Sequence, residues 1–367
     1  MKIKNRIIII YLLTALILSP ICISNFTVAS GAEAVKTSDS YKLTTIIGNL
    51  LNKFFSRHKD DEQIPKKAEL LFVGDLMVGR YVGTLIKRNK TGVHHLLKNL
   101  LKKDKDFFNG YDVISANLEG AVTDKGSHYN PKYTHDFAFL PDRIEVFKDY
   151  NFNFFNLANN HFGDQGVKGV KETRKHLDSM GIDYSGCRDG DIGGCTYNII
   201  NAGTFSMAMV GFSMVYKTPK EEEMIKIIEK AKKESDKLIV NVHWGIEYGH
   251  KFNKKQQNLA YKFIDAGADL IIGHHPHVVQ GMEFYKGKAI FYSLGNFIFD
   301  QYFSRSVQEG LTINASFEGD DIKYSFHPIK SKKSQVYLMN DAEKKIFMKK
   351  FIGWSKLEED EKALIGF

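Results

Sequence analysis

Residues 270–280 read LIIGHHPHVVQ, in which the apolar run Leu270–Ile272 is followed almost at once by His274, His275 and His277. A short, bounded apolar run is typical of a buried strand. If the segment stays extended, the spacing His-Pro-His presents two imidazoles on the same side of the chain, which is a chelating arrangement. The stretch therefore predicts a strand that delivers a cluster of imidazoles at its carboxyl end.

The same order, an apolar run and then a polar side chain, recurs along the sequence. Asp75 follows LLFVG, Asn117 and Glu119 follow VISA, Asn159, Asn160 and His161 follow FFNLA, His243 follows LIVNV, and Asn296 follows IFYSLG. In an α/β sheet, ligands bind outside the carboxyl ends of the strands. Strand ends that each deliver a carboxylate, an amide or an imidazole therefore predict one shared site.

Short apolar runs alternate with amphipathic stretches, a pattern that predicts an α/β fold. The expected strands are Leu70–Val73, Val113–Ala116, Phe154–Leu157, Met207–Val210, Leu238–Val242, Leu270–Ile272 and Ile290–Tyr292, with one or two more in Gly310–Pro328. The expected helices are Val167–Ser179, Lys220–Lys237 and Lys254–Ala266, with an amphipathic candidate around Ile346–Trp354.

Composition narrows the functional classes. The 367 residues are 43% hydrophobic, which excludes a wholly disordered protein, and the formal net charge of +8 suits an anionic partner without proving one. The sequence has no GxSxG nucleophile elbow and no phosphate-binding P-loop. Basic residues form no concentrated stripe interleaved with aromatics, so we expect no nucleic-acid partner.

The N-terminus has the form of an export signal. Lys2, Lys4 and Arg6 precede the mostly apolar run Ile7–Ile23, and small residues follow it. We therefore expect residues 1–34 to be a cleaved signal peptide or an uncleaved membrane anchor, with a buried helix as the alternative. Either leading interpretation exports the rest of the chain, to the outer face of the cytoplasmic membrane or into the medium.

Three further segments follow that signal. Residues 35–67 are expected to be a linker with an amphipathic helix, which either lies on the membrane or docks on the main domain. Residues 68–330 form the predicted main domain, and 331–367 a Lys/Glu-rich helical extension. Cys187 and Cys195, eight positions apart, would close a small disulfide loop in an oxidising compartment, while two free thiols are equally compatible with the sequence.

The residue types at the strand ends indicate the chemistry of the site. Carboxylates, amides and imidazoles without a thiolate suit Mn²⁺, Zn²⁺ or Fe²⁺, and we expect one or two ions. His161 is placed to protonate a leaving group, with Asp164 either orienting its ring or capping the next helix. We expect substrate contacts from Arg80, Asn159, His274 and Asn296. Four aromatic residues either line a groove or pack in the core: Trp244, Tyr248, Phe297 and Phe299.

Six motifs stand in the order typical of a known family: GDLMVGR (74–80), NLEGAV (117–122), NLANNHFGDQG (156–166), VHWGIEY (242–248), GHHPHVVQ (273–280) and FYSLGNFIFDQ (291–301). From about Glu69 to Pro328 the sequence resembles the CapA family of bacterial poly-γ-glutamate capsule biosynthesis proteins. The resemblance implies a membrane-anchored protein with its globular domain outside the cell. It also implies the fold of the calcineurin-like metallophosphoesterases, a four-layer αββα sandwich.

The resemblance further implies a set of functional residues, with His161 as proton donor and metal ligands at Asp75, Glu119, Asn160, His243, His275 and His277. Two positions depart from the wider superfamily. Met77 stands where its first motif has a histidine, and a thioether is a poor ligand for hard ions; Glu119 replaces the bridging aspartate.

Two functions follow as expectations. The first is a part in poly-γ-glutamate synthesis or export, with the polymer and a capsule-synthase membrane complex as partners. The alternative is an active metal-dependent phosphoesterase on an extracellular phosphate ester, with no connection to a capsule.

Overall fold

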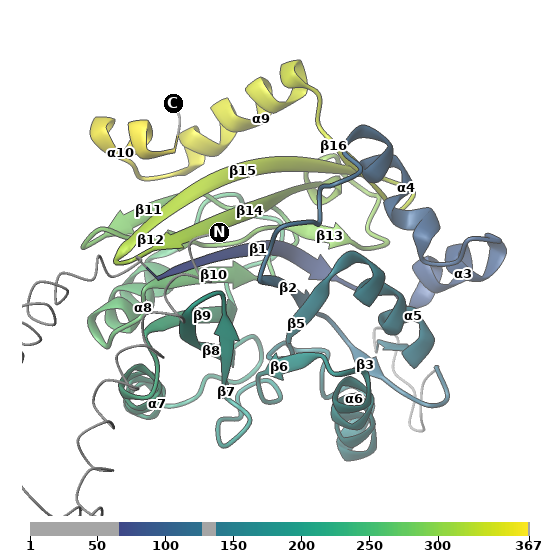
Figure 1. Cartoon of the computed structure of the whole chain (residues 1–367), viewed down its shortest axis with the longest axis horizontal. Helices are drawn as coiled ribbons and strands as arrows, with labels where there is room; N and C mark the ends of the chain where they lie inside the picture. The colour runs from purple at the N-terminus through teal and green to yellow at the C-terminus, as the bar shows by residue number, and fades with distance from the viewer. Residues whose placement is uncertain (1–65, 127–136, 366–367) are drawn as a thin grey trace, which may run out of the picture. The chain divides into compact units, whose positions relative to one another are not determined.

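The computed structural model describes residues 66–126 and 137–365 (Figure 1). The predicted signal or anchor at 1–34 lies outside these residues, as does all but the end of the predicted linker at 35–67. In the two described ranges, no helix combines the length and the apolarity needed to cross a bilayer.

Two sheets form the centre of the domain. The first has the strand order β16 (Gln335–Leu338), β15 (Asp321–Lys332), β14 (Glu309–Glu318), β1 (Lys67–Leu76), β2 (Val113–Leu118), β5 (Phe152–Asn156), β6 (Asp183–Ser185), with β13 (Asn296–Ile298) beside β1. The second has the order β11 (Met282–Tyr285), β12 (Lys288–Phe291), β10 (Leu270–His274), β9 (Lys237–His243), β8 (Phe205–Ser213), β7 (Tyr197–Ala202). Two short strands, β3 (Ala121–Val122) and β4 (Ala138–Phe139), pair separately.

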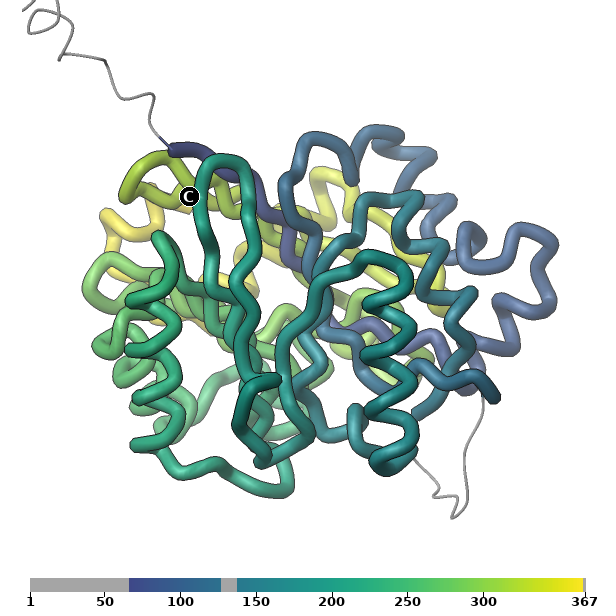
Figure 2. The backbone as a smooth tube through the Cα atoms, turned by 60° about the horizontal axis from the view of Figure 1, so that its bottom comes forward, coloured from purple at the N-terminus to yellow at the C-terminus, as the bar shows by residue number. Residues whose placement is uncertain are grey.

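Alternation along the strands creates the layers. In β1, Leu70 and Phe72 join the core between the sheets, while Leu71 and Val73 face the helices of the first sheet. Those helices are α3 (Arg80–Arg88), α4 (His94–Lys103), α5 (Pro141–Glu145) and α6 (Gly166–Met180). The second sheet is covered by α7 (Glu221–Lys233) and α8 (Lys254–Asp265), and Figure 2 shows α6 and α7 on opposite sides of the strands.

This arrangement is the predicted four-layer α/β sandwich, and each of the seven apolar runs coincides with a strand, although Leu157 and Tyr292 lie one residue beyond the ends of β5 and β12. The predicted helix Lys220–Lys237 was too long, because it ends at Lys233 and β9 begins at Lys237. After the predicted boundary at 331, β16 still extends the first sheet. The helices of that segment are α9 (Asp341–Trp354), which contacts β11 and β15, and α10 (Glu359–Leu364).

Gly74 brings β1 against the segment before β13. A Cβ at this position would lie 1.9 Å from the carbonyl oxygen of Gly295, which accepts a hydrogen bond from the Asp75 N–H at 2.9 Å. We expect Gly74→Ala to lower the free energy of unfolding by about 1–3 kcal/mol, the usual range for overpacking, as measured by urea denaturation. Gly353→Ala, in open space on α9, is the control and should leave stability unchanged or slightly raised. Equal stability of Gly74→Ala and the wild type would contradict the close approach.

Candidate metal centre

Strand register brings the predicted residues together. Within the first sheet, Asp75 lies opposite Asn117 and opposite Asn296, and Asn117 lies opposite Asn156. In the second sheet, His243 lies opposite His274. These pairings are parallel, so the carboxyl ends of β1, β2 and β5 share one edge, and those of β9 and β10 share another. The prediction of one site at the strand ends agrees with this geometry.

The polar side chains at these strand ends form a cluster, and Asn117 lies at its centre. Its amide nitrogen lies 2.9 Å from Asp75 Oδ1, 3.4 Å from Glu119 Oε2 and 3.3 Å from His243 Nδ1. Its carbonyl oxygen accepts from the amides of Asn156, at 3.1 Å, and Asn159, at 3.3 Å. One fully buried amide therefore links residues of both sheets.

Several buried atoms that could ligate a metal have no hydrogen-bond partner. Among the described residues they include, at these strand ends, Asp75 Oδ2, Glu119 Oε1, His274 Nδ1 and His275 Nδ1. Buried polar groups are costly unless they are paired or coordinate a metal. Two trios each have potential ligand atoms within 4.8 Å of one another: Asp75, Glu119 and His243, and Glu247, His275 and His277. The donor set fits a borderline divalent ion at either trio.

The two carboxylates respond differently to burial. Burial would raise the pKa of Asp75, but the imidazoles of His274 and His277 beside it outweigh that effect and hold the pKa well below its usual range. For Glu119 burial dominates and raises the pKa well above its usual range, although His277 opposes it. His277 Nδ1 lies 3.3 Å from Asp75 Oδ2, and its Nε2 lies 3.7 Å from Glu119 Oε1.

The pKa values of the three imidazoles also differ. Burial lowers the pKa of His243, and the neighbouring His275 lowers it further. Burial and the charge of His277 lower the pKa of His275 to about 4. Burial opposes protonation of His277 as well, but Glu119 and Asp75 raise its pKa to about 9. Neutral imidazoles are the form that binds metals, so two of the three predicted histidine ligands are already in it at neutral pH.

The backbone around the histidines is not extended. His275 has φ 96° and His277 has φ 56°, so the extended His-Pro-His geometry expected from the sequence is wrong. The rings still approach, with centroids 5.9 Å apart, because the left-handed backbone turns them together. Such conformations cost on the order of 1–3 kcal/mol each and persist where surrounding structure enforces them.

Asp164 holds the His161 ring through the nitrogen that is farther from Glu119. Its Nδ1 lies 2.7 Å from Asp164 Oδ2, and the ring stacks on Phe137 at 3.8 Å, which leaves Nε2 3.9 Å from Glu119 Oε1. The alternative role for Asp164, capping a helix, is not realised, because α6 begins at Gly166 with Gln165 at its N-cap. The side chains of His161 and Asp164 are 13% and 17% exposed, so the dyad borders solvent.

Three of the four residues predicted to contact substrate are buried. Asn159 donates to the carbonyl of Leu118, and His274 lies 3.4 Å from Asp75. Asn296 lies 3.0 Å from His277 Nδ1 and orients that ring. Arg80 is partly exposed and pairs with Asp300 at 3.2 Å. In this conformation Arg80 alone of the four has a side chain open to a ligand, while the other three contact residues of the cluster.

Four aromatic residues were expected either to line a groove or to pack in the core. Phe297 and Phe299 are core residues, and Trp244 is buried with its indole N–H donating to the carbonyl of Tyr292. Tyr248 is 44% exposed and stacks over His277, with ring centroids 6.4 Å apart. Only Tyr248 therefore lies at the surface beside the cluster.

Sequence reasoning missed Glu247, whose Oε1 lies 4.0 Å from His277 Nε2. It lies in the loop after β9, inside the motif VHWGIEY, but it does not directly follow a strand as the other predicted ligands do. Asn156 was also missed, although strand periodicity could have found it, because it is buried in β5 opposite Asn117. Met77 supplies no ligand atom to the cluster: its sulfur accepts the Gly79 N–H at 3.1 Å.

A disulfide joins Cys187 and Cys195, with a Cα–Cα distance of 5.3 Å. The loop that it closes contains Asp189, whose carboxylate anchors the segment after β8. Four groups donate to it: Ser213 Oγ at 2.5 Å, and the backbone N–H groups of Val215 at 2.8 Å and of Tyr216 and Lys217 at 2.9 Å. The disulfide loop therefore positions residues 213–217 beside the end of β9.

Comparisons with known proteins agree with the motifs. The model of the family described as "Bacterial capsule synthesis protein PGA_cap" matches residues 69–301. Capsule biosynthesis protein CapA of Bacillus anthracis is 33% identical over 276 residues, 70% of this chain and 64% of the relative. PGA biosynthesis protein CapA of Bacillus subtilis (strain 168) is 35% identical over 257 residues, 65% of each. The alignments thus span slightly less than two thirds of these relatives' lengths.

Among solved structures, a phosphatase from Mycoplasma pneumoniae superposes with a TM-score of 0.47 at 13% identity, covering 77% of this chain and 97% of that one. At this score the likeness carries no argument about activity.

Replacing Cys187 and Cys195 together by serine should lower the free energy of unfolding by about 2–3 kcal/mol, the chain-entropy estimate for so short a loop. Urea denaturation under non-reducing conditions measures the difference. Adding a reductant should bring the wild type to the same midpoint and leave the double variant unchanged. A wild type that does not respond to the reductant would contradict a bonded pair.

Proposed function

We propose that this chain, which belongs to the PGA_cap family of bacterial capsule synthesis proteins, acts in the synthesis or export of a γ-linked glutamate polymer. We place it at the outer face of the cytoplasmic membrane, held by its N-terminal segment and working with a capsule-synthase membrane complex. The basic, then apolar, N-terminus supports export, and so does the Cys187–Cys195 disulfide, since disulfides persist in oxidising compartments.

We further propose that the strand-end cluster is a metal centre with hydrolase or transferase activity. The observation that carries this proposal is the set of buried, unpartnered ligand atoms on Asp75, Glu119, His274 and His275. Asp75, Glu119, Asn160, His243, His275 and His277 would hold one or two ions, with Glu247 available beside the two last histidines. A bound divalent ion supplies Lewis-acid stabilisation of charge on a reacting oxygen.

The chain's own residues would divide the remaining work. His161 donates the proton that a leaving oxygen needs, because its Nε2 is directed toward the cluster while Nδ1 is held by Asp164. Donation from Nε2 requires the ring to carry a proton on both nitrogens; Asp164 accepts the Nδ1–H and so fixes the ring's orientation, and the Phe137 ring packs against one face of the imidazole. Arg80 is the one cation at this edge predicted to meet an anionic substrate.

The same dyad favours a second candidate function, an active phosphoesterase on an extracellular phosphate ester unrelated to a capsule. A proton donor at 3.9 Å from Glu119 has a clear use in hydrolysis and none in passive metal binding. The two candidates share the metal centre and differ in the substrate.

His243→Ala combined with His275→Ala should abolish both metal binding and Mn²⁺-dependent cleavage of a generic phosphodiester. Each histidine offers a buried nitrogen to one of the two trios, so their loss leaves neither trio complete. Elemental analysis and turnover are measured on the full chain, with His94→Ala, an exposed histidine on α4, as the control. Metal without turnover in the wild type would contradict catalysis and leave a binding site, and a folded wild type without metal would contradict the metal centre itself.

His161→Asn should lower kcat by about 10²–10⁴ while the metal content stays at the wild-type level. The loss should be larger for an alkyl phosphodiester than for a nitrophenyl one, because an alkoxide needs a proton to leave and nitrophenolate does not. Asp164→Asn should show the same dependence on the leaving group with a smaller loss. An equal loss for both substrates would assign His161 to positioning or metal binding instead.

A further inference from the structure

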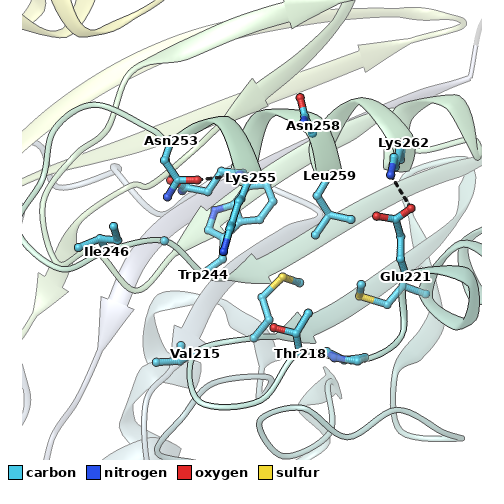
Figure 3. Close-up of a pocket in the computed structure, with 15 residues that line it drawn as sticks. Val215, Thr218, Glu221, Trp244, Ile246, Asn253, Lys255, Asn258, Leu259 and Lys262 are labelled. Carbon is cyan, nitrogen blue, oxygen red and sulfur yellow. Dashed lines mark hydrogen bonds and ion pairs between the residues drawn. The ribbon is translucent and has the colours of Figure 1, made fainter.

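A pocket of about 560 Å³ lies just beyond the end of β9, where Trp244, Gly245 and Ile246 line it (Figure 3). One wall is a face of α8, where Lys255, Asn258, Leu259 and Lys262 follow one another at helical spacing. The opposite wall is the segment Met214–Pro219 between β8 and α7. Its size is within the range of small-ligand sites.

The lining combines an apolar floor with a cationic rim. Met214, Met224, Trp244 and Leu259 supply the floor. At one end, Lys262 is neutralised by Glu221 at 2.5 Å, a pair that Figure 3 shows joining α8 to α7. Lys255, by contrast, has no carboxylate within ion-pair distance among the residues that the structure describes. The pocket therefore offers one uncompensated positive charge above an apolar surface.

The pocket and the metal centre share one short loop. His243 and Trp244 are consecutive residues at the end of β9, and they lie on opposite sides of the second sheet. Ile246 borders the pocket and the next residue, Glu247, belongs to a ligand trio, so the two sites take consecutive residues of this loop. Ile246 is 69% exposed, so this part of the loop lies at the surface.

Hydrogen bonds to one carboxylate hold the pocket wall opposite α8 in place. Asp189 accepts hydrogen bonds from Ser213 and from the N–H groups of Val215, Tyr216 and Lys217, and it lies inside the Cys187–Cys195 loop. A binding wall that is ordered beforehand gains affinity, because the ligand does not have to order it.

We propose that this pocket binds a glutamyl unit of the γ-linked glutamate chain while a neighbouring part of the same chain lies at the metal centre. This inference rests on the proposed function and names the place where its substrate is held. The free α-carboxylate of the unit pairs with Lys255, and the two methylene groups, which in a γ-linked chain are part of the main chain, lie on the floor formed by Trp244, Leu259 and Met214. A charge-assisted contact at the rim and apolar contact below it match a ligand whose main chain carries a free carboxylate on Cα beside a two-methylene segment.

Tryptophan fluorescence provides the test, because the chain has only two tryptophans. In a Trp354→Phe background of the full chain, emission reports Trp244 alone, and it is titrated with a synthetic pentamer of γ-linked glutamate. We expect saturable binding that Lys255→Gln weakens roughly tenfold. The matched control is Lys254→Gln, which removes the same charge from the neighbouring position outside the pocket and should change affinity less than about twofold. A pentamer with amidated carboxylates should bind as weakly as the charged one binds to Lys255→Gln.

Three outcomes would overturn the proposal. The first is a wild type that does not bind the pentamer. The second is an equal loss for Lys255→Gln and Lys254→Gln, which would indicate attraction by net charge alone. The third is a loss on His243→Ala with His275→Ala but none on Lys255→Gln, which would place the ligand at the cluster only. Metal content and phosphodiester turnover of the wild type are measured separately, so failure of the catalytic proposal is distinguishable from failure of this one.

Discussion

The buried amide of Asn117 is the constraint on which the site depends. It donates toward Asp75 on its own sheet and toward His243 on the other, while its oxygen accepts from Asn156 and Asn159. An interior network of this kind stabilises the protein only when its members are satisfied, since each unpaired polar group is costly there. Registers that slipped by one residue would turn Asn117 to the opposite face and leave those partners unpaired. The register that packs the two sheets is therefore the same register that places the ligand atoms.

Electrostatics explains why this edge of the sandwich favours a cation. Asp75 and Glu119 are both fully buried, with the His277 ring beside both of them and the uncharged amide of Asn117 in contact with each. The pKa values of Glu119 and His277 are both raised, so both groups tend to hold a proton. These protons offset buried negative charge that a bound divalent ion would offset instead. The left-handed backbone at His275 and His277 adds a conformational cost in the same place. Strain and buried charge gathered at one edge are typical of a functional site rather than of a stabilising core.

The strands and the main ligand candidates were predictable because each carries a local signal. A short apolar run predicts a buried strand, and a polar residue directly after it, such as Asp75 or His243, is placed at the strand end by that fact alone. No such signal marks Glu247, which reaches His277 through the path of a loop. The short helices α3 and α4 were missed because so few turns form only against the sheet that they cover. The left-handed turn of His275 and His277 depends on packing between two sheets, which spacing in one segment does not reveal.

The end of β9 shows how one strand can serve two binding surfaces. Its last residue, His243, faces the cluster between the sheets, and the next, Trp244, faces the helices and forms the floor of the pocket. Because side chains alternate along a strand, a displacement of this segment moves both surfaces at once. Asp189 and the disulfide that encloses it restrain the adjoining strand end at Ser213, and with it the opposite wall. Both surfaces are therefore ordered before a ligand binds. A ligand that spans them would bind more tightly, because no free energy is lost in ordering the protein.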